Sequence, residues 1–198
     1  MDGDVFVFQM NNRRSYVALN PLKEEALHSF TICLRTFTDR SGSYGLFEFR
    51  SNAPYNSEIT VLKSFYKSYI LTVGGEAAEF VTPDVINQWV HLCFSWGSAN
   101  GTARLWLDLH PLPRKGLSKG YIHQGTPSIK LGMRRDNPSN EYQQYVGEIC
   151  HVSMWDYVLS RDEIQDSMFW SKTFPMGNIL SWRNLTYNLI NNVVVEPF

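Results

Sequence analysis

The feature that most constrains this chain is a series of short segments in which apolar and polar residues alternate. In Ser29–Thr38, for example, Phe30, Ile32 and Leu34 occupy every second position. A period of two residues places successive side chains on opposite faces of a β-strand. Such segments, separated by turn formers such as Asn20-Pro21, predict an all-β sandwich.

We expect strands at the following segments: Val5–Phe8, Ser15–Leu19, Ser29–Thr38, Tyr44–Arg50, Glu58–Lys63, Tyr69–Val73, Glu76–Val81, Trp89–Trp96, Thr102–Leu109, Ser128–Gly132, Tyr145–Trp155, Leu185–Leu189 and Val193–Val195. The polar stretch Arg134–Gln144 has no apolar period and predicts a loop, as does His110–Gly120 with its two prolines. No repeat or shift in composition divides the chain, so residues 1–198 are expected to form a single domain.

One short helix is predicted near the C-terminal end of the chain. Ser160-Arg161-Asp162-Glu163 fits a capping box, in which the serine hydroxyl and the glutamate carboxylate each accept a backbone N–H. We expect the helix to run from about Arg161 to Met168 and to pack Ile164 and Met168 against the sandwich.

Charge and hydropathy exclude several function classes. The net charge is -1, which offers no electrostatic case for nucleic-acid binding or for an anionic membrane surface. No run of about 18 apolar residues is present, so no membrane insertion is expected. No nucleophile elbow, paired-carboxylate pattern or zinc spacing appears, so we expect no catalytic residues and no enzyme activity, and a jelly-roll glycosidase is the least favoured alternative.

The cysteines leave two interpretations open. Cys33 and Cys93 lie in predicted central strands, either as buried free thiols or as a disulfide closing a loop of about 60 residues. Cys150 is expected to be a buried, inert thiol. Two sequons, at Asn100 and Asn184, are candidate glycosylation sites that favour an extracellular location.

A motif inside the strand at Trp89–Trp96 resembles a known family signature. His91-x-Cys93-x-Ser95-Trp96-x-Ser98 resembles the signature of the pentraxins, which are secreted calcium-dependent recognition proteins. Further segments resemble the same family along the whole chain: Ser29–Leu34, Thr72–Gly75, Lys115–Tyr121, Ile129–Gly132, Val146–Ile149, Met154–Ser160 and Asn178–Trp182. The chain is similar to the short pentraxins, with no additional N-terminal domain.

The resemblance implies a two-sheet, lectin-like (concanavalin-type) jelly-roll sandwich with one short α-helix. It also implies a Cys33–Cys93 disulfide, a secreted homopentamer, calcium as cofactor, and complement or immune receptors as partners. The family's calcium ligands align with Asn56, Ser57, Arg135, Asp136, Glu141 and Gln143, where the place of one acid falls near Asn140 or Glu141.

The aligned calcium loops depart from the family pattern. Arg134 stands where the family has an acid, and at an effective dielectric near 20 a unit-charge repulsion at 4 Å costs about 4 kcal/mol. We therefore expect weak calcium binding, or binding of one ion only. Arg134 has two interpretations: a solvated loop charge, or a residue that binds a phosphate or carboxylate directly.

The ligand pocket implied by the resemblance maps to Leu62, Thr72 and Arg134. The acid that contacts choline in the family maps to Ala77, and Glu76 is one strand step away and is expected to point to the other face. The expected function is recognition of phosphocholine-like, phosphorylated or anionic ligands on cell or microbial surfaces. The alternative is a pentraxin scaffold or structural glycoprotein that has lost this binding.

Overall fold

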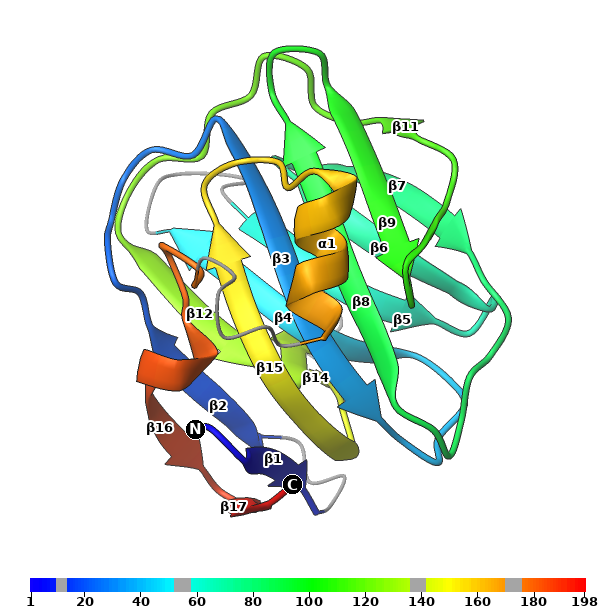
Figure 1. Cartoon of the computed structure of the whole chain (residues 1–198), viewed down its shortest axis with the longest axis vertical. Helices are drawn as coiled ribbons and strands as arrows, with labels where there is room; N and C mark the ends of the chain where they lie inside the picture. The colour runs from blue at the N-terminus through cyan, green and yellow to red at the C-terminus, as the bar shows by residue number, and fades with distance from the viewer. Residues whose placement is uncertain (10–13, 52–57, 136–141, 170–175) are drawn as a thin grey trace.

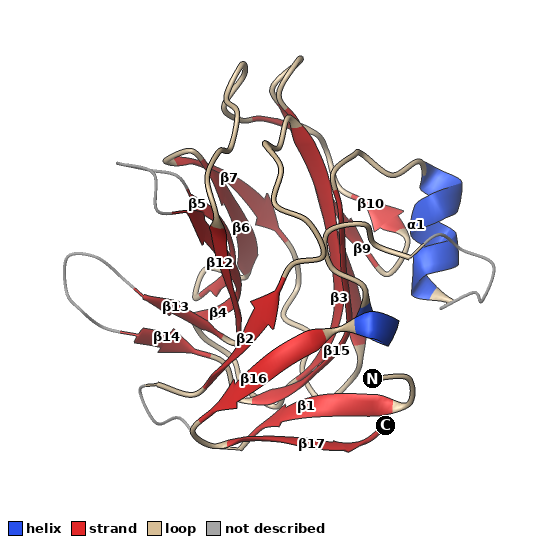
Figure 2. Ribbon diagram, turned by 90° about the vertical axis from the view of Figure 1, so that its left-hand side faces the viewer, coloured by secondary structure: helices blue, strands red, loops and turns tan. Residues whose placement is uncertain are grey.

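The computed structural model describes residues 1–9, 14–51, 58–135, 142–169 and 176–198. Two antiparallel sheets pack face to face, and the two termini lie close together at one end (Figures 1 and 2). The eight-stranded sheet has the order β10-β9-β8-β3-β15-β1-β17, with β11 also paired to β9. The seven-stranded sheet has the order β16-β2-β12-β4-β5-β6-β7, and β13 pairs with β14 in a separate ribbon.

The element bounds follow the sequence expectation closely. The strands are β1 (Asp4–Phe8), β2 (Tyr16–Asn20), β3 (Ser29–Phe37), β4 (Tyr44–Ser51), β5 (Glu58–Ser64), β6 (Ser68–Val73), β7 (Glu76–Val81), β8 (Val90–Gly97), β9 (Thr102–Leu107), β10 (His110–Pro111), β11 (Lys115–Gly116), β12 (Pro127–Leu131), β13 (Met133–Arg135), β14 (Tyr142–Gln144), β15 (Gly147–Trp155), β16 (Thr186–Ile190) and β17 (Val193–Pro197). A 3-10 turn covers Trp182–Asn184. The prediction of an all-β sandwich with one short α-helix is confirmed.

Two predicted loops contain strands. β13 and β14 lie inside or beside the stretch Arg134–Gln144, and β10 and β11 lie within His110–Gly120. The loop predictions were wrong at these points because strands of two or three residues are too short to show an apolar period. Their identity depends on hydrogen bonding to a neighbouring strand.

The core fills the space between the two sheets. Every second residue of the central strands points inward, so aromatic and branched side chains of both layers interdigitate. Phe30 and Phe94 from the eight-stranded sheet and Phe47, Val61 and Leu71 from the seven-stranded sheet are fully buried. The outward-facing residues of the same strands are therefore free to build surface sites.

Helix α1 (Arg161–Met168) lies across the outer face of the eight-stranded sheet (Figure 1). The predicted capping box is confirmed: the Ser160 hydroxyl accepts from the Glu163 N–H at 3.3 Å, and the Glu163 carboxylate accepts from the Ser160 N–H at 2.7 Å. Ile164 is buried as expected, but the second buried residue is Ser167 and not Met168. Among the described residues no helix is long and apolar enough to cross a bilayer.

Removing the cap should weaken α1 measurably. We expect Ser160→Ala to lower the free energy of unfolding by about 1 kcal/mol, because the Glu163 N–H in the first turn loses the hydroxyl that accepts from it. Denaturant unfolding of the variant beside Gln165→Ala, an exposed position of the same helix, measures the effect. An equal loss in both variants would show that the capping box contributes nothing beyond helix propensity.

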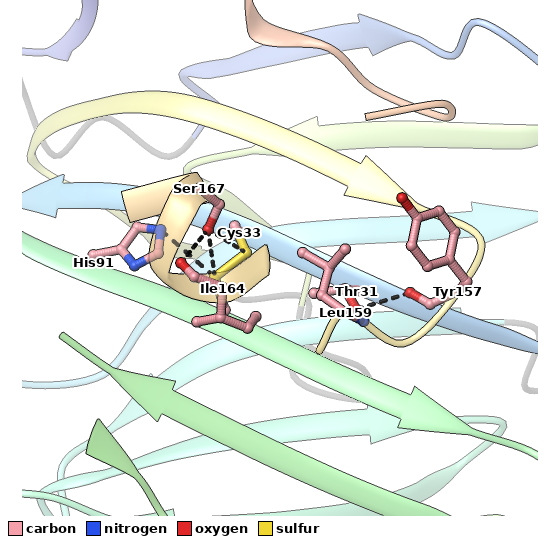
Figure 3. The surroundings of a disulfide bond; sticks show 8 residues. Thr31, Cys33, His91, Tyr157, Leu159, Ile164 and Ser167 are labelled. Atoms are coloured by element: carbon pink, nitrogen blue, oxygen red, sulfur yellow. Dashed lines mark hydrogen bonds between the residues drawn. A yellow bond between two sulfur atoms is a disulfide. The ribbon is translucent and has the colours of Figure 1, made fainter. Parts of the chain in front are cut away.

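The predicted disulfide between Cys33 and Cys93 is confirmed. The two residues are direct partners in the β3–β8 register, and α1 covers their bonded sulfurs (Figure 3). The Ser167 hydroxyl lies 3.8 Å from Cys33 Sγ and 3.7 Å from Cys93 Sγ. Cys150 is free and buried as expected, and burial raises the pKa of its thiol to about 12, so it stays protonated.

Candidate ligand-binding face

The candidate site lies on the outer face of the seven-stranded sheet, away from α1 (Figure 2). Strand register aligns Glu48 with Thr60, Thr60 with Thr72, and Thr72 with Ala77, so these side chains form one row across β4, β5, β6 and β7. Their sequence neighbours point into the core, and the row therefore faces outward. This face carries the ligand residues expected from the sequence.

Leu62 and Thr72 share that face. Leu62 is two residues beyond Thr60 on β5, and Thr72 is the direct partner of Thr60 on β6. Leu62 is only 5% exposed and Thr72 only 7%, although both point away from the core. An apolar side chain and a hydroxyl thus lie on neighbouring strands of the outer face.

Arg134 is brought next to Leu62 by a glycine. Gly45 on β4 is the partner of Leu62, and a Cβ atom at Gly45 would lie 2.5 Å from the Arg134 backbone nitrogen and 2.7 Å from the Arg134 Cβ. Such distances exclude any larger residue at Gly45. The missing side chain therefore allows β13 to lie directly on β4 beside Leu62.

Arg134 and Gln143 face each other across the β13–β14 ribbon. They are direct register partners, so their side chains lie on the same face of the ribbon. Within the described part of the chain, Arg134 Nε and Gln143 Oε1 are buried and have no hydrogen-bond partner. Gln144 belongs to the opposite face, where its Nε2 donates to the Ser15 carbonyl at 3.1 Å. A buried donor and a buried acceptor are therefore both left without a hydrogen-bond partner among the described residues.

Most of the expected calcium ligands cannot be placed. Asn56, Ser57, Asp136 and Glu141 lie outside the described residues, and Arg135 is described only as part of the β13 backbone. Gln143 Oε1 suits a calcium ion, which prefers hard oxygen ligands. The Arg134 guanidinium on the same ribbon face opposes one. The described residues therefore supply one suitable oxygen and one repelling cation.

The buried acid of this face is already paired. Glu48 is 2% exposed, and its carboxylate oxygens lie 3.2 Å from Arg50 Nη2 and 3.8 Å from Lys130 Nζ. Two basic side chains flank this carboxylate, and Glu58 is the register partner of Arg50 on the neighbouring strand. The Glu48 carboxylate is therefore engaged by cations and not free to bind a metal ion.

The expectation for Glu76 is confirmed. Ala77 is the partner of Thr72 on the outer face, while the Glu76 carboxylate accepts from the Ser118 N–H at 2.7 Å and from its hydroxyl at 3.2 Å. Glu79 shares the face of Ala77 but accepts from the Ser68 hydroxyl at 2.6 Å. No acid is therefore directly opposite Thr72.

The histidine of the signature is structural. His91 is 2% exposed, and its Nε2 lies 3.5 Å from Cys93 Sγ. Burial and the charges of Arg35 and His151 lower the pKa of His91 to about 3, which keeps the ring neutral. Cys33, His91 and Cys93 offer metal-donor atoms within 4.8 Å of one another, but the two sulfurs are bonded to each other.

Both sequon asparagines are accessible. Asn100 is exposed in the turn between β8 and β9, and its Oδ1 accepts from the Thr102 N–H at 3.1 Å. Asn184 is exposed at the end of the 3-10 turn. Their position at the surface satisfies the steric requirement of a glycan.

The sequence did not predict a groove elsewhere on the molecule. A groove of about 650 Å³ lies on the opposite face, between β8, β9 and the start of α1, and it is lined by Arg104, Trp106, Arg114 and Arg161 among others. Arg104 and Trp106 alternate with the buried Leu105, which was a local signal that both point outward. Their meeting with Arg114 and Arg161 depends on tertiary structure.

The architecture defines a class of protein: a lectin-type jelly-roll sandwich. Comparison with protein families then shows which member of that class it is. Residues 4–197 match the Pentaxin family model, and the chain belongs to the pentraxin family.

Curated relatives agree over the full chain. A mucosal pentraxin from Rattus norvegicus is 37% identical over 200 residues, covering 100% of this chain and 88% of the relative. A C-reactive protein from Oryctolagus cuniculus is 39% identical over 202 residues, with the same coverage of 100% and 88%. A serum amyloid P-component from Cavia porcellus is 36% identical, again over 100% and 88%.

Among solved structures, a native heptameric SAP-like pentraxin from Limulus polyphemus superposes with a TM-score of 0.81. The match covers 98% of this chain and 95% of that chain at 16% sequence identity. At this identity the match establishes the fold alone, and it confirms the jelly-roll prediction.

Proposed function

We propose that this chain is a secreted recognition protein that binds phosphorylated or anionic ligands through Leu62, Thr72 and Arg134, with weakened dependence on calcium. The observation that carries the proposal is the Arg134–Gln143 pair, which offers an unpartnered guanidinium nitrogen beside the apolar Leu62. A guanidinium binds an oxyanion through charge-assisted hydrogen bonds, which are stronger than neutral ones.

The surrounding charges favour an anion over a metal ion. Arg134 places a cation on this face, and the Glu48 carboxylate is already paired with Arg50 and Lys130. Ala77, opposite Thr72, leaves a choline group without a carboxylate partner, so we propose a phosphate ester without selectivity for choline. The expected calcium ligands Asn56, Ser57, Arg135, Asp136, Glu141 and Gln143 would then hold at most one weakly bound ion.

Ligand binding in the absence of calcium tests the proposal. We expect phosphocholine and phosphoethanolamine to bind with similar affinity in EDTA, measured by isothermal titration calorimetry, and Arg134→Gln to remove the binding. Binding that appears only with millimolar calcium would contradict direct recognition by Arg134.

Restoring an acid at position 134 should restore calcium affinity. We expect Arg134→Glu to lower the calcium dissociation constant at least about tenfold, because the change replaces a repelling cation with a ligand carboxylate in a partly solvated site. Calorimetric titration with calcium measures this, and Arg161→Glu makes the same charge change on the opposite face as a control. Equal affinities of the parent chain and Arg134→Glu would exclude Arg134 as the cause of weak calcium binding.

In this proposal, the oligomeric assembly and the extracellular location of the protein are inferred from its family. A homopentamer would present five weak sites together and gain avidity, and the heptameric Limulus polyphemus structure supports a ring of subunits in general. Secretion, glycans at Asn100 and Asn184, a single domain over 1–198, and complement or immune-receptor partners belong to the same proposal. We propose no enzyme activity, because the described face carries no unpaired carboxylate pair suited to glycoside cleavage.

The second candidate is a scaffold that has lost ligand binding. Four of the aligned calcium-ligand positions, including Asn56 and Ser57, lie outside the described residues. The departures from the family pattern at Arg134 and Ala77 favour the scaffold. Absence of heat with both calcium and phosphate esters would select the scaffold.

A further inference from the structure

The groove beside α1 is built differently from the face described above. It lies between β8, β9 and the segment entering α1. Figure 2 shows α1 on this side of the sandwich, with the β13–β14 ribbon on the other. Three arginines line it: Arg104 from β9, Arg114 from the segment between β10 and β11, and Arg161 at the start of α1. None of the described residues that line the groove is acidic.

The charge of Arg104 is held in place inside the groove. Its Nε donates to the Leu112 carbonyl at 3.2 Å, and its guanidinium lies 5.1 Å from the centre of the Trp106 ring. Burial lowers the pKa of Arg104, and the charge of Arg114 lowers it further. The two guanidiniums therefore repel each other, and an anion between them would relieve the repulsion.

Within residues 1–9, 14–51, 58–135, 142–169 and 176–198, no carboxylate lies at ion-pair distance from Arg104, Arg114 or Arg161. Asp162 and Glu163 belong to the first turn of α1, and Glu163 is engaged with the Ser160 N–H at 2.7 Å. The remaining lining of the groove combines two kinds of surface. Trp106, Pro111 and Val158 are apolar, while Ser95 and Thr102 add hydroxyls.

We infer that this groove binds an acidic saccharide of one or two rings, with its sulfate or carboxylate between Arg104 and Arg114. Sugars present apolar ring faces and hydroxyls together, which matches the mixture of apolar Pro111 and Val158 with polar side chains in the lining. A volume of about 650 Å³ lies within the usual range for a small-molecule site. The site is separate from the proposed phosphate site, because the two lie on opposite faces of the sandwich.

A site-specific titration tests the inference. Protein without N-glycans is labelled with 5-fluorotryptophan, the Trp106 resonance is assigned with Trp106→Phe, and a chondroitin sulfate disaccharide is added in EDTA. We expect a saturable shift of the Trp106 resonance with the disaccharide, none with lactose, and at least about tenfold weaker binding of inorganic sulfate. No shift with the disaccharide, an equal shift with lactose, or equally tight binding of sulfate would overturn it.

Two variants separate this site from the proposed phosphate site. Arg104→Gln should raise the dissociation constant of the disaccharide at least about tenfold, because a charge-assisted contact is lost. Arg134→Gln should leave the Trp106 titration unchanged while it removes phosphate-ester binding. If Arg104→Gln fails to fold, the same titration is made with Arg114→Gln, since Arg114 is exposed. An unchanged affinity for the disaccharide in that variant overturns the inference.

Discussion

Removal of the Cys33–Cys93 disulfide is expected to lower the free energy of unfolding by about 4 kcal/mol. The bond joins residues 60 apart in sequence, so it restricts a large loop of the unfolded chain. The loss of stability is not offset in the native state, because the sulfurs lie in a buried layer between the central strands β3 and β8 and helix α1. Denaturant unfolding of Cys33→Ala/Cys93→Ala at fixed protein concentration measures the loss.

Cys150→Ala is the matched control for this experiment. It removes a buried sulfur without opening a loop, so we expect a loss of about 1 kcal/mol from packing alone. A similar loss in the double variant and in Cys150→Ala would mean that the disulfide does not act through the unfolded chain. The denaturant concentration at which α1 is half unfolded should be lower in the double variant than in the parent chain, since Ile164 and Ser167 pack on the bond.

Acid is expected to destabilise the protein before its carboxylates titrate. Burial lowers the pKa of His123 to about 4, burial and the charge of Arg35 lower that of His151 to about 4, and burial with the charges of Arg35 and His151 lowers that of His91 to about 3. In the unfolded chain all three would titrate near 6.5, so the unfolded state binds more protons below that pH. Stability is therefore fully present above pH 6.5 and is lost as the pH falls toward 4.

Each of these histidines contributes a slope of about 1.4 kcal/mol per pH unit within that window, and His91, His123 and His151 together contribute about 4.1. The free energy of unfolding, measured with denaturant at several values between pH 7.5 and 4.5, should show this slope. Stability that stays constant from pH 6.5 to 5 would contradict neutral burial of these rings.

His123→Leu isolates one of the three contributions. Within the described residues neither nitrogen of the His123 ring has a hydrogen-bond partner, and the ring packs edge-on against Phe49 at 4.7 Å. Replacing it should therefore reduce the slope by about a third, because the remaining contribution comes from His91 and His151. His110→Leu removes an exposed imidazole and serves as the control. An unchanged slope in His123→Leu would assign the acid effect to other groups.

Local patterns predicted most of the fold. The alternation in Ser29–Thr38 and Trp89–Trp96 located two central strands, and the capping box at Ser160 located the helix to the residue. These features are set by neighbours within a few positions, so they can be found without the rest of the molecule. The β13–β14 ribbon could not be found this way, because its short polar strands exist only by pairing.

The candidate site was predicted less completely. Glu76 was placed correctly, because the side-chain direction within a strand depends only on its period of two. The two interpretations of Arg134 could not be separated in advance, since its neighbours Gly45 and Leu62 are about 70 to 90 positions away in the chain.

The sequence by itself determined the strands, the helix, the pentraxin family and, through that family, the disulfide pairing. Only the tertiary structure decided that Arg134 lies over Gly45 with Gln143 opposite, and that Arg104, Arg114 and Arg161 converge on one groove. The reason is physical. Hydrophobic periodicity is a local property of the chain, whereas a site is made by cross-strand register and by the packing of layers that bring distant residues together.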